Sequence, residues 1–297
     1  MKDIAVIIIN FNTSAYTLKC VEKVFEKTNP KISFEIVVVD NNSEKKDFEH
    51  LSKNLRKAEN VTLIKSDINT GFGGGNNLGF SHSNSKYILF LNNDAFLIND
   101  CLQLAINFME ENPQAGIAGA QNYDEYNQFV SSFDHDKGLR KLLFGRSFLQ
   151  KLNPKKYPCV KTNYTYPVCV NWVNGAFMFM RAEDFKRVGK FDPEIFLYFE
   201  EMDLSQRMLK INKKTFLIPG AKIMHYQGKS TGKNHLLAQE GLISFLYVLK
   251  KNKGILKQVL IRLYFILTFA FKTKKWRFLK IVLSPNPKKF SLRPKIS

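Results

Sequence analysis

Apolar and polar residues alternate along the first hundred residues in blocks that predict buried strands separated by amphipathic helices. Runs of β-branched residues at 4–9 and 35–40 are typical of strands covered on both faces. Apolar runs at 61–66 and 86–94 predict two further strands, and the apolar spacing over 15–27 predicts a helix after the first. Strands that alternate with helices predict an α/β layer fold with a parallel sheet.

The pattern is less regular beyond this region. Segment 121–170 is basic, aromatic and proline-containing, and its periodicity predicts neither strand nor helix. The stretch 170–185, VNWVNGAFMFMRAEDF, predicts a strand and a turn into a helix. The stretch 196–212, FLYFEEMDLSQRMLKIN, predicts a loop that enters a helix, with acids in the first turn where the helix dipole favours them. The short strand KTFLIP follows at 214–219.

Composition and charge narrow the class of protein. An apolar fraction of 44% excludes a disordered chain, and a formal charge of +19 suggests an anionic partner. No acid follows Glu240, whereas fourteen Lys and Arg lie from Lys250 onward. Nucleic acid is a weak candidate for that partner, because the basic residues are interspersed with Leu, Phe and Ile. The four cysteines show no CxxC spacing, which fits unpaired thiols in the cytoplasm.

The basic C-terminal tail predicts a separate role. Its apolar stretch 259–271, VLIRLYFILTFAF, contains an Arg and is shorter than the ~20 residues that span a bilayer. Flanking basic residues favour an interfacial helix, with Trp276 and Phe278 at the level of the lipid headgroups. The alternative is a basic helix that docks on the protein's own acidic surface. We therefore expect a catalytic domain over 1–235 and a helical, membrane-associating segment over 236–297.

Acidic residues follow three of the predicted apolar segments. Asp40 and Asp94 end two strands, and a cluster of three acids follows the apolar run FLYF. Ligands of open parallel sheets bind at the carboxyl ends of the strands, so these acids are candidates for one site. Asp94, in the sequence NND, is the best candidate ligand for Mg²⁺ or Mn²⁺, which often take one or two carboxylates plus diphosphate oxygens. His225 is a candidate for a further metal ligand or a phosphate contact.

A glycine-rich turn, NTGFGGGNNLGF at 69–80, leaves two interpretations open. Gly73, Gly75 and Gly79 form GxGxxxG, which is close to a dinucleotide fingerprint. Such a fingerprint belongs after the first strand, however, and the first turn here has no glycine. Close packing of a helix on the sheet explains the glycines equally well. The neighbouring asparagines favour a polar ligand that contacts this turn.

The order of these motifs resembles the family-2 glycosyltransferases, especially the bacterial rhamnosyltransferase-like branch. The resemblance covers residues 4–231 and includes IIINFN, VVVDNNS, NTGFGGGNNLGF, LFLNND, WVNGAFMFMRAEDF, FLYFEEMDL and IMHYQGKST. It implies a GT-A fold, which is a Rossmann-like three-layer sandwich, here followed by the basic amphipathic tail. It also implies metal-dependent transfer of a sugar, with inversion, from a nucleotide-diphosphate donor. dTDP-rhamnose is the favoured donor, and UDP- or GDP-sugars remain open.

The resemblance also assigns roles to residues. Those it places at the nucleotide are Asn10, Asn12, Asp40, Asn69, Gly71, Asn76 and Asn93. It assigns Asp94, the last residue of a DxD-type motif, as a metal ligand. It also implies that His225 completes the metal or phosphate contacts. The DxD position reads Asn-Asn-Asp here, so one acid remains. The catalytic aspartate of the family's ED pair is replaced by Glu201, whose side chain is one methylene longer.

We expect Glu201 to take the proton from the acceptor hydroxyl, with apolar neighbours that raise its pKa. Glu200 and Asp203 are expected to orient the loop or to bind acceptor hydroxyls. Trp172 offers a flat surface for the acceptor sugar. The acceptor is expected to be a glycan or a lipid-linked glycan in cell-surface polysaccharide synthesis. That role places the protein in the cytoplasm, on the inner face of the cell membrane.

Two rival functions make different predictions. An NAD(P)-dependent oxidoreductase that uses the glycine turn would bind a nicotinamide cofactor, and it leaves the acidic cluster without a role. A non-catalytic nucleotide-sugar binder would bind the donor without turnover.

Overall fold

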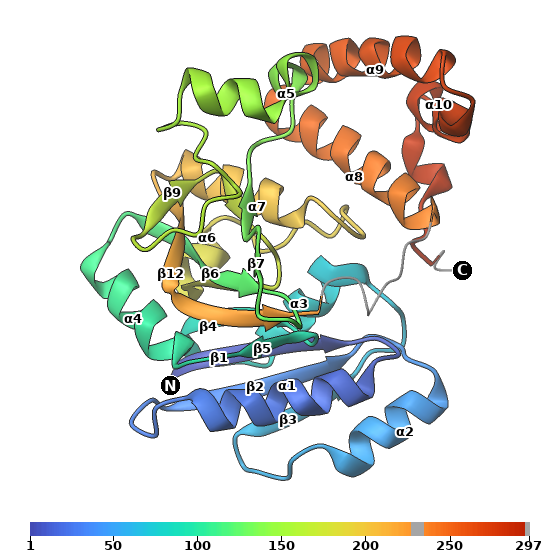
Figure 1. The fold of residues 1–297 in the computed structure, drawn as a ribbon. Coiled ribbons are helices and arrows are strands. Elements are labelled where there is room, and N and C mark those ends of the chain that lie inside the picture. The colour runs from blue at the N-terminus through green and yellow to red at the C-terminus, as the bar shows by residue number, and fades with distance from the viewer. Residues whose placement is uncertain (227–234, 295–297) are drawn as a thin grey trace.

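The computed structural model describes residues 1–226 and 235–294. Its main sheet runs in the order β3-β2-β1-β4-β11-β6-β12-β5, with β7 and β9 added at the side (Figure 1). The first half contains β1 (Lys2–Asn10), α1 (Ser14–Lys27), β2 (Phe34–Asp40), α2 (Lys45–Asn54), β3 (Val61–Lys65), α3 (Gly71–Ser81), β4 (Ser85–Asn92), β5 (Ala95–Leu97), α4 (Cys101–Glu111), β6 (Ala115–Tyr123), β7 (Phe129–Val130) and β8 (Phe133–Asp134).

The second half contains α5 (Leu139–Leu152), β9 (Val168–Val170), β10 (Trp172–Val173), β11 (Phe177–Arg181), α6 (Ala182–Arg187), α7 (Glu200–Lys210), β12 (Lys214–His225), α8 (His235–Lys253), α9 (Ile255–Ala270) and α10 (Trp276–Leu283). Short 3-10 turns flank α10. The strands and helices expected in the first hundred residues are confirmed. The irregular middle of the chain contains α5, whose backbone kinks at Gly145.

The expectation of a parallel sheet is wrong for its second half. Strands β1 to β4 pair with one another in parallel. β11 runs antiparallel to both β4 and β6, and β5 runs antiparallel to β12. An antiparallel β5 brings the residues after β4 beside the end of β12, although the two segments are distant in sequence.

Two apolar cores lie on opposite faces of the sheet and define three layers. Ile4, Val6 and Ile8 of β1 face α1, α2 and α4, where they pack with residues such as Val21. The alternate residues Ala5 and Ile7 face α3, α6 and α7 on the other side. This alternation follows from the two-residue repeat of a strand, and it explains why the whole run is apolar. The three-layer sandwich is thereby confirmed.

The C-terminal helices share a third core with the loop before α7. Phe245 and Val248 of α8 pack with Ile195 and Met202, and Ile261 of α9 joins them. The boundary predicted after residue 235 falls after the first residue of α8, and the apolar core joins α8 to the loop before α7. Among the described residues, no helix is both long and apolar enough to cross a membrane. Phe278 is buried against α8 and not at a headgroup level, so that part of the tail prediction is wrong.

Candidate active site

The carboxyl ends of β1 and β2 are joined by buried polar side chains. Asn10 pairs with Asp40 in register, and its amide donates a 2.9 Å hydrogen bond to Asp40 Oδ1. Asp40 Oδ2 accepts the backbone N–H of Ser43 at 3.1 Å. Asp40 is fully buried, so its carboxylate orders this corner of the sheet, and its contact with the nucleotide stays a prediction. Asn12 is exposed at the same corner, with a positive φ of 55°.

The turn before α3 is held by Asn41, a residue that was not predicted. Its side-chain amide donates to Asn69 Oδ1 and to the carbonyl of Gly71, each at 3.1 Å. Its Oδ1 accepts the backbone N–H of Thr70 at 3.1 Å. Gly71 has φ +75°, and a Cβ there would overlap the carbonyl oxygen of Phe196. Asn69 and Gly71 therefore belong to a tightly held turn at the strand ends, and their contact with the nucleotide stays a prediction.

The later glycines of α3 serve helix–sheet packing. A Cβ on Gly79 would approach Ile7 Cγ2 to 2.5 Å, and one on Gly75 would lie 3.2 Å from Ile9 Cδ1. Glycine at these positions lets α3 approach β1 closely, which costs helix propensity but permits the contact. Of the two interpretations of GxGxxxG, the structure supports packing.

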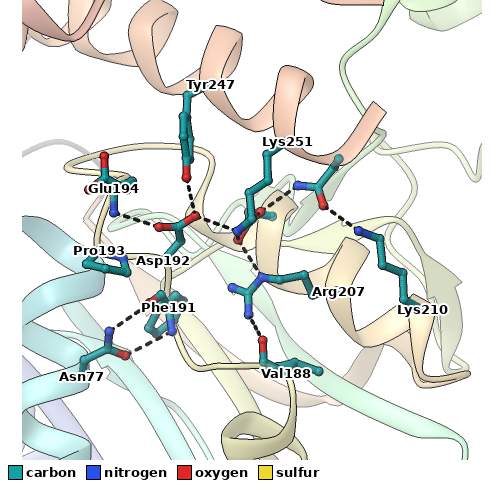
Figure 2. Close-up of polar contacts among 12 residues, drawn as sticks. Asn77, Val188, Phe191, Asp192, Pro193, Glu194, Arg207, Lys210, Tyr247 and Lys251 are labelled. Carbon is teal, nitrogen blue, oxygen red and sulfur yellow. Dashed lines mark hydrogen bonds and ion pairs between the residues drawn. The ribbon is translucent and has the colours of Figure 1, made fainter. Parts of the chain in front are cut away.

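Two asparagines of α3 are used within the protein. Asn76 is buried and donates to the carbonyl of Phe72 one turn earlier at 3.0 Å, and its contact with the nucleotide stays a prediction. Asn77 makes two hydrogen bonds with the backbone of Phe191, at 2.9 and 3.1 Å. That pair ties α3 to the loop that leads to α7, as Figure 2 shows.

Asp94 and His225 meet at the end of β4. Antiparallel pairing of β5 with β12 sets His225 opposite Ala95, and Tyr226 donates its N–H to the Asp94 carbonyl at 3.1 Å. His225 Nε2 lies 3.4 Å from Asp94 Oδ1, and both residues are buried. Within residues 1–226 and 235–294, Asp94 Oδ1 and His225 Nδ1 have no hydrogen-bond partner. Asn93 does not point to this pair: its amide donates to Thr13 and Thr17.

These two side chains fit a hard divalent cation. Adjacent ligands of an octahedral ion with bonds of about 2.1 Å lie about 3 Å apart, which is close to the observed separation. A buried carboxylate oxygen without a hydrogen bond is costly unless a cation compensates it. No group of three or more His, Cys, Asp and Glu that could hold a metal occurs in the described part of the chain. Two protein ligands leave room for diphosphate oxygens and water, as is usual for Mg²⁺.

Glu201 lies at the first turn of α7 and faces the loop between β10 and β11. Its Oε1 accepts the backbone N–H of Gly175 at 3.2 Å. Burial raises the pKa of the Glu201 carboxyl, while its own N–H and that of Gly175 oppose the shift. A carboxyl with a raised pKa is a better proton acceptor when it does ionise, which suits a general base. The position of Gly175 in the motif WVNGAF was a signal that the sequence analysis did not use.

A strained loop presents the first turn of α7. Tyr198 and Phe199 both have φ 70°, a left-handed conformation that bulky residues rarely adopt. Helix α8 supports the loop, since Ser244 Oγ donates to the carbonyl of Leu197 at 2.8 Å and Phe199 packs on Phe245. The conformation at 198–199 is therefore fixed by the C-terminal helices.

Glu200 does not line an open site. It is buried, and one of its oxygens has no hydrogen-bond partner among the described residues. Burial, and next the charge of Glu201, raise the pKa of the Glu200 carboxyl well above its usual range. Of the two roles expected of Glu200, orienting the loop fits this buried position better than binding acceptor hydroxyls.

Asp203 is the centre of a buried ionic network, which suits the first of the two roles expected of it, namely to orient the loop. It is fully buried, and it accepts hydrogen bonds from Arg207 at 2.8 Å and Asn252 at 2.7 Å. Lys251 of α8 lies 2.9 Å from Asp203 and 2.7 Å from Asp192, bridging the two acids (Figure 2). The network fastens α8 to α7 and to the loop before it.

A cavity of about 300 Å³ lies around β8 and β10, one residue from the contact of Gly175 with Glu201. The residues that line it are Val130, Ser131, Phe133, Asp134, Arg146, Trp172 and Asn174. Trp172 pairs with Asp134 across β10 and β8. The indole N–H of Trp172 is buried without a hydrogen-bond partner in the described residues. Asn174 in the cavity wall immediately precedes Gly175, whose N–H binds the Glu201 carboxylate.

The fold is that of the GT-A glycosyltransferases. A mannosyltransferase from Pyrobaculum calidifontis, solved with GDP-Man and Mn²⁺, superposes with a TM-score of 0.60 at 12% identity, over 97% of this chain and 79% of that one. GalNAc-T7 with UDP, GalNAc and Mn²⁺ superposes with a TM-score of 0.59 at 15% identity, over 98% and 56%. At these identities the likeness concerns the fold alone.

Sequence comparison identifies the family. The model for glycosyl transferase family 2 matches residues 5–172, more than half of the chain. The chain therefore belongs to glycosyl transferase family 2. It is 31% identical over 167 residues to the rhamnosyltransferase WbbL of Escherichia coli (strain K12), covering 52% of this chain and 61% of that protein.

A second relative is the N-acetylglucosaminyl-diphospho-decaprenol L-rhamnosyltransferase of Mycobacterium tuberculosis (strain ATCC 25618 / H37Rv). It is 30% identical over 88 residues, which are 29% of this chain and 28% of that protein. The matched region spans less than two thirds of either relative. The resemblance to rhamnosyltransferases is confirmed, and the oxidoreductase alternative is not favoured.

Proposed function

We propose that this glycosyltransferase transfers a sugar, with inversion, from a nucleotide-diphosphate donor to a hydroxyl of a glycan or lipid-linked glycan in cell-surface polysaccharide synthesis. dTDP-rhamnose is the favoured donor because the relatives include rhamnosyltransferases. UDP- and GDP-sugars are the alternatives. The observation that carries the proposal is the Glu201 carboxylate, which is held by Gly175, the residue that follows Asn174 in the wall of a cavity large enough for a sugar.

In the proposed reaction Glu201 accepts the proton of the acceptor hydroxyl. The oxygen forms a bond to the anomeric carbon while the bond from that carbon to the diphosphate breaks. The nucleoside diphosphate leaves from the opposite face, and no covalent enzyme intermediate forms. Burial keeps water from competing for the Glu201 carboxylate, and the Gly175 N–H fixes the direction in which the accepting oxygen points.

The donor site is proposed at the edge formed by the ends of β1, β2 and β4. Asn12, Asn69 and Gly71 lie on turns at this edge and are the leading candidates for nucleotide contacts, with the buried Asn10, Asp40 and Asn76 behind them. Asp94 and His225 would hold Mg²⁺ or Mn²⁺, which when bound neutralises charge on the departing diphosphate. Asn93 would act by positioning, through Thr13 and Thr17.

The acceptor site is proposed in the cavity around β8 and β10. Trp172 supplies an aromatic wall and an indole N–H that lacks a partner among the described residues, and both suit a sugar with its hydroxyls. A lipid-linked acceptor fits a protein that works in the cytoplasm on the inner face of the membrane. The basic tail, 236–297, would attach it there.

Calorimetric titration of UDP, GDP and dTDP, each with and without Mn²⁺, tests the donor site. We expect one nucleotide to bind in a metal-dependent manner to the wild type. Failure of all three would refute the placement of Asn69, Asp94 and His225 in a single donor site. Metal-dependent binding without sugar transfer to any lipid-linked glycan fraction would favour the non-catalytic binder.

A further inference from the structure

Two basic segments of the chain, far apart in sequence, meet at one edge of the molecule. The chain has no Asp or Glu between Asp136 and Glu183, and none after Glu240. The first of these segments forms α5, and the second forms α9 and α10. Tyr264 of α9 donates its hydroxyl to the carbonyl of Leu142 in α5 at 3.2 Å. Figure 1 shows α5 and α9 together along the edge farthest from β3.

Each helix buries one face and exposes large apolar side chains on another. In α9, Ile261 and Phe265 are buried, whereas Leu263 and Leu267 are 51% and 65% exposed. The exposed apolar residues of α9 and of the turns around it are Ile255, Leu256, Val259, Leu260, Leu263, Leu267, Phe271 and Trp276. Exposed apolar side chains at such density indicate a surface that binds another protein or a membrane.

Helix α5 repeats this arrangement. Phe144 and Phe148 are both more than half exposed, and their rings lie 5.7 Å apart beside the kink at Gly145. Leu143 and Leu152 are exposed as well. Exposed basic residues lie within or next to both helices along the chain. They are Arg140, Lys151, Lys155, Lys156, Lys257, Lys272, Lys274 and Lys275.

We infer that α5 and α9 together form one surface that binds an anionic lipid bilayer. The apolar side chains match the acyl boundary of the lipids, and the acid-free basic rim matches their headgroups. A second copy of this chain fits less well, because a twofold contact would bring two strongly basic faces together. The inference rests on the membrane attachment proposed above. It adds helix α5, which lies outside the basic tail, to the surface that binds the membrane.

This surface has a consequence for the proposed acceptor site. Arg146 of α5 lines the cavity around β8 and β10, while Phe144 and Phe148 of the same helix are exposed. One helix therefore connects the cavity to the bilayer-binding surface. A lipid-linked acceptor would reach the cavity from the membrane without leaving its leaflet.

Vesicle flotation of the full chain tests the inference, with vesicles of phosphatidylglycerol and phosphatidylcholine or of phosphatidylcholine alone. The variants are F144S/F148S on α5, L263S/L267S on α9, and L209S, an exposed leucine on α7 that serves as control. We expect each double variant to lower the affinity for anionic vesicles by at least about tenfold. L209S is expected to bind as the wild type does, and thermal unfolding checks that every variant is folded.

The outcomes separate the inference from the proposed function. Loss of binding in L263S/L267S with full binding in F144S/F148S would overturn the role of α5 and leave attachment by the tail intact. A wild type that ignores anionic vesicles would overturn membrane attachment altogether. A dimer in sedimentation equilibrium that F144S/F148S dissociates would show that the surface binds a second copy instead.

Discussion

Gly175 donates its backbone N–H to the carboxylate of Glu201 across a space that no side chain can share. The hydrogen bond is 3.2 Å long, and a Cβ built on Gly175 would lie 2.6 Å from Glu201 Oε1. The two residues are 26 positions apart in sequence, at the end of β10 and the start of α7. The Gly175 backbone fixes the orientation of the Glu201 carboxylate. This contact therefore tolerates less change than the other contacts of the candidate site.

Substitution G175A is therefore expected to displace the Glu201 carboxylate. The added methyl must push the oxygen away, and a displacement of about 1 Å can lower a rate about a hundredfold. We expect kcat for sugar transfer to fall by that order, with nucleotide affinity unchanged in calorimetry. The matched control is G220A, because a Cβ at Gly220 meets its nearest atom at 3.9 Å. Equal activity of G175A and wild type would contradict the assignment.

Substitution D94N is expected to abolish the metal dependence of nucleotide binding. The change removes the negative charge that a divalent cation requires while it preserves the shape of the side chain. Affinity with Mn²⁺ should fall to the value measured without it, as read by calorimetry. D124N, in the turn between β6 and β7, is the control and should behave as wild type. An unchanged effect of Mn²⁺ in D94N would place the metal elsewhere.

The pH dependence of stability is expected to report on Glu200. Its pKa is raised above the usual value of 4.5, so the native state retains a proton that the unfolded chain releases. The free energy of unfolding therefore decreases as pH rises from about 4.5 toward the raised pKa. E200Q removes this contribution, and its free energy of unfolding should decrease less between pH 5 and 8. Urea denaturation at each pH measures the free energy of unfolding, and E183Q, at an exposed position, is the control.

Substitution K251M is expected to destabilise the protein by about 3 kcal/mol, because it removes the ammonium group that pairs with both Asp192 and Asp203. Asp203 is fully buried and would keep Arg207 and Asn252 as its side-chain partners among the described residues. The same change at the neighbouring exposed Lys250 should cost less than about 0.5 kcal/mol. Urea denaturation of both variants decides the point. Equal stability of K251M and K250M would show that α8 is held by its apolar contacts alone.

Much of the fold could be predicted from the chain, because strands such as β1 are covered on both faces and are apolar throughout. The direction of β11 and β5 could not, since antiparallel pairing depends on contacts distant in sequence. Helix α3 forms despite its glycines because packing on Ile7 and Ile9 outweighs their low helix propensity. The kinked α5 was missed because its apolar residues are divided between a buried and an exposed face.

The candidate site was predictable where acids end strands, and Asp94 with His225 lies at such a place. The buried partners of Asp40 and Asp203 could not be predicted, because a sequence does not reveal which distant residue a carboxylate will contact. Asn10 donates a hydrogen bond to Asp40, and Lys251 forms an ion pair with Asp203. Gly175 was missed for a similar reason: its importance is a single contact with Glu201 that only the folded chain creates.

The most direct test of the account compares wild type and E201Q in two assays on the same preparation. Donor binding is measured by calorimetry with Mn²⁺, and transfer is measured with labelled dTDP-rhamnose, UDP-sugars and GDP-sugars and a lipid-linked glycan fraction. We expect E201Q to bind the donor as the wild type does and to transfer sugar at least about a hundredfold more slowly. Transfer by E201Q at the wild-type rate would show that Glu201 is not the base.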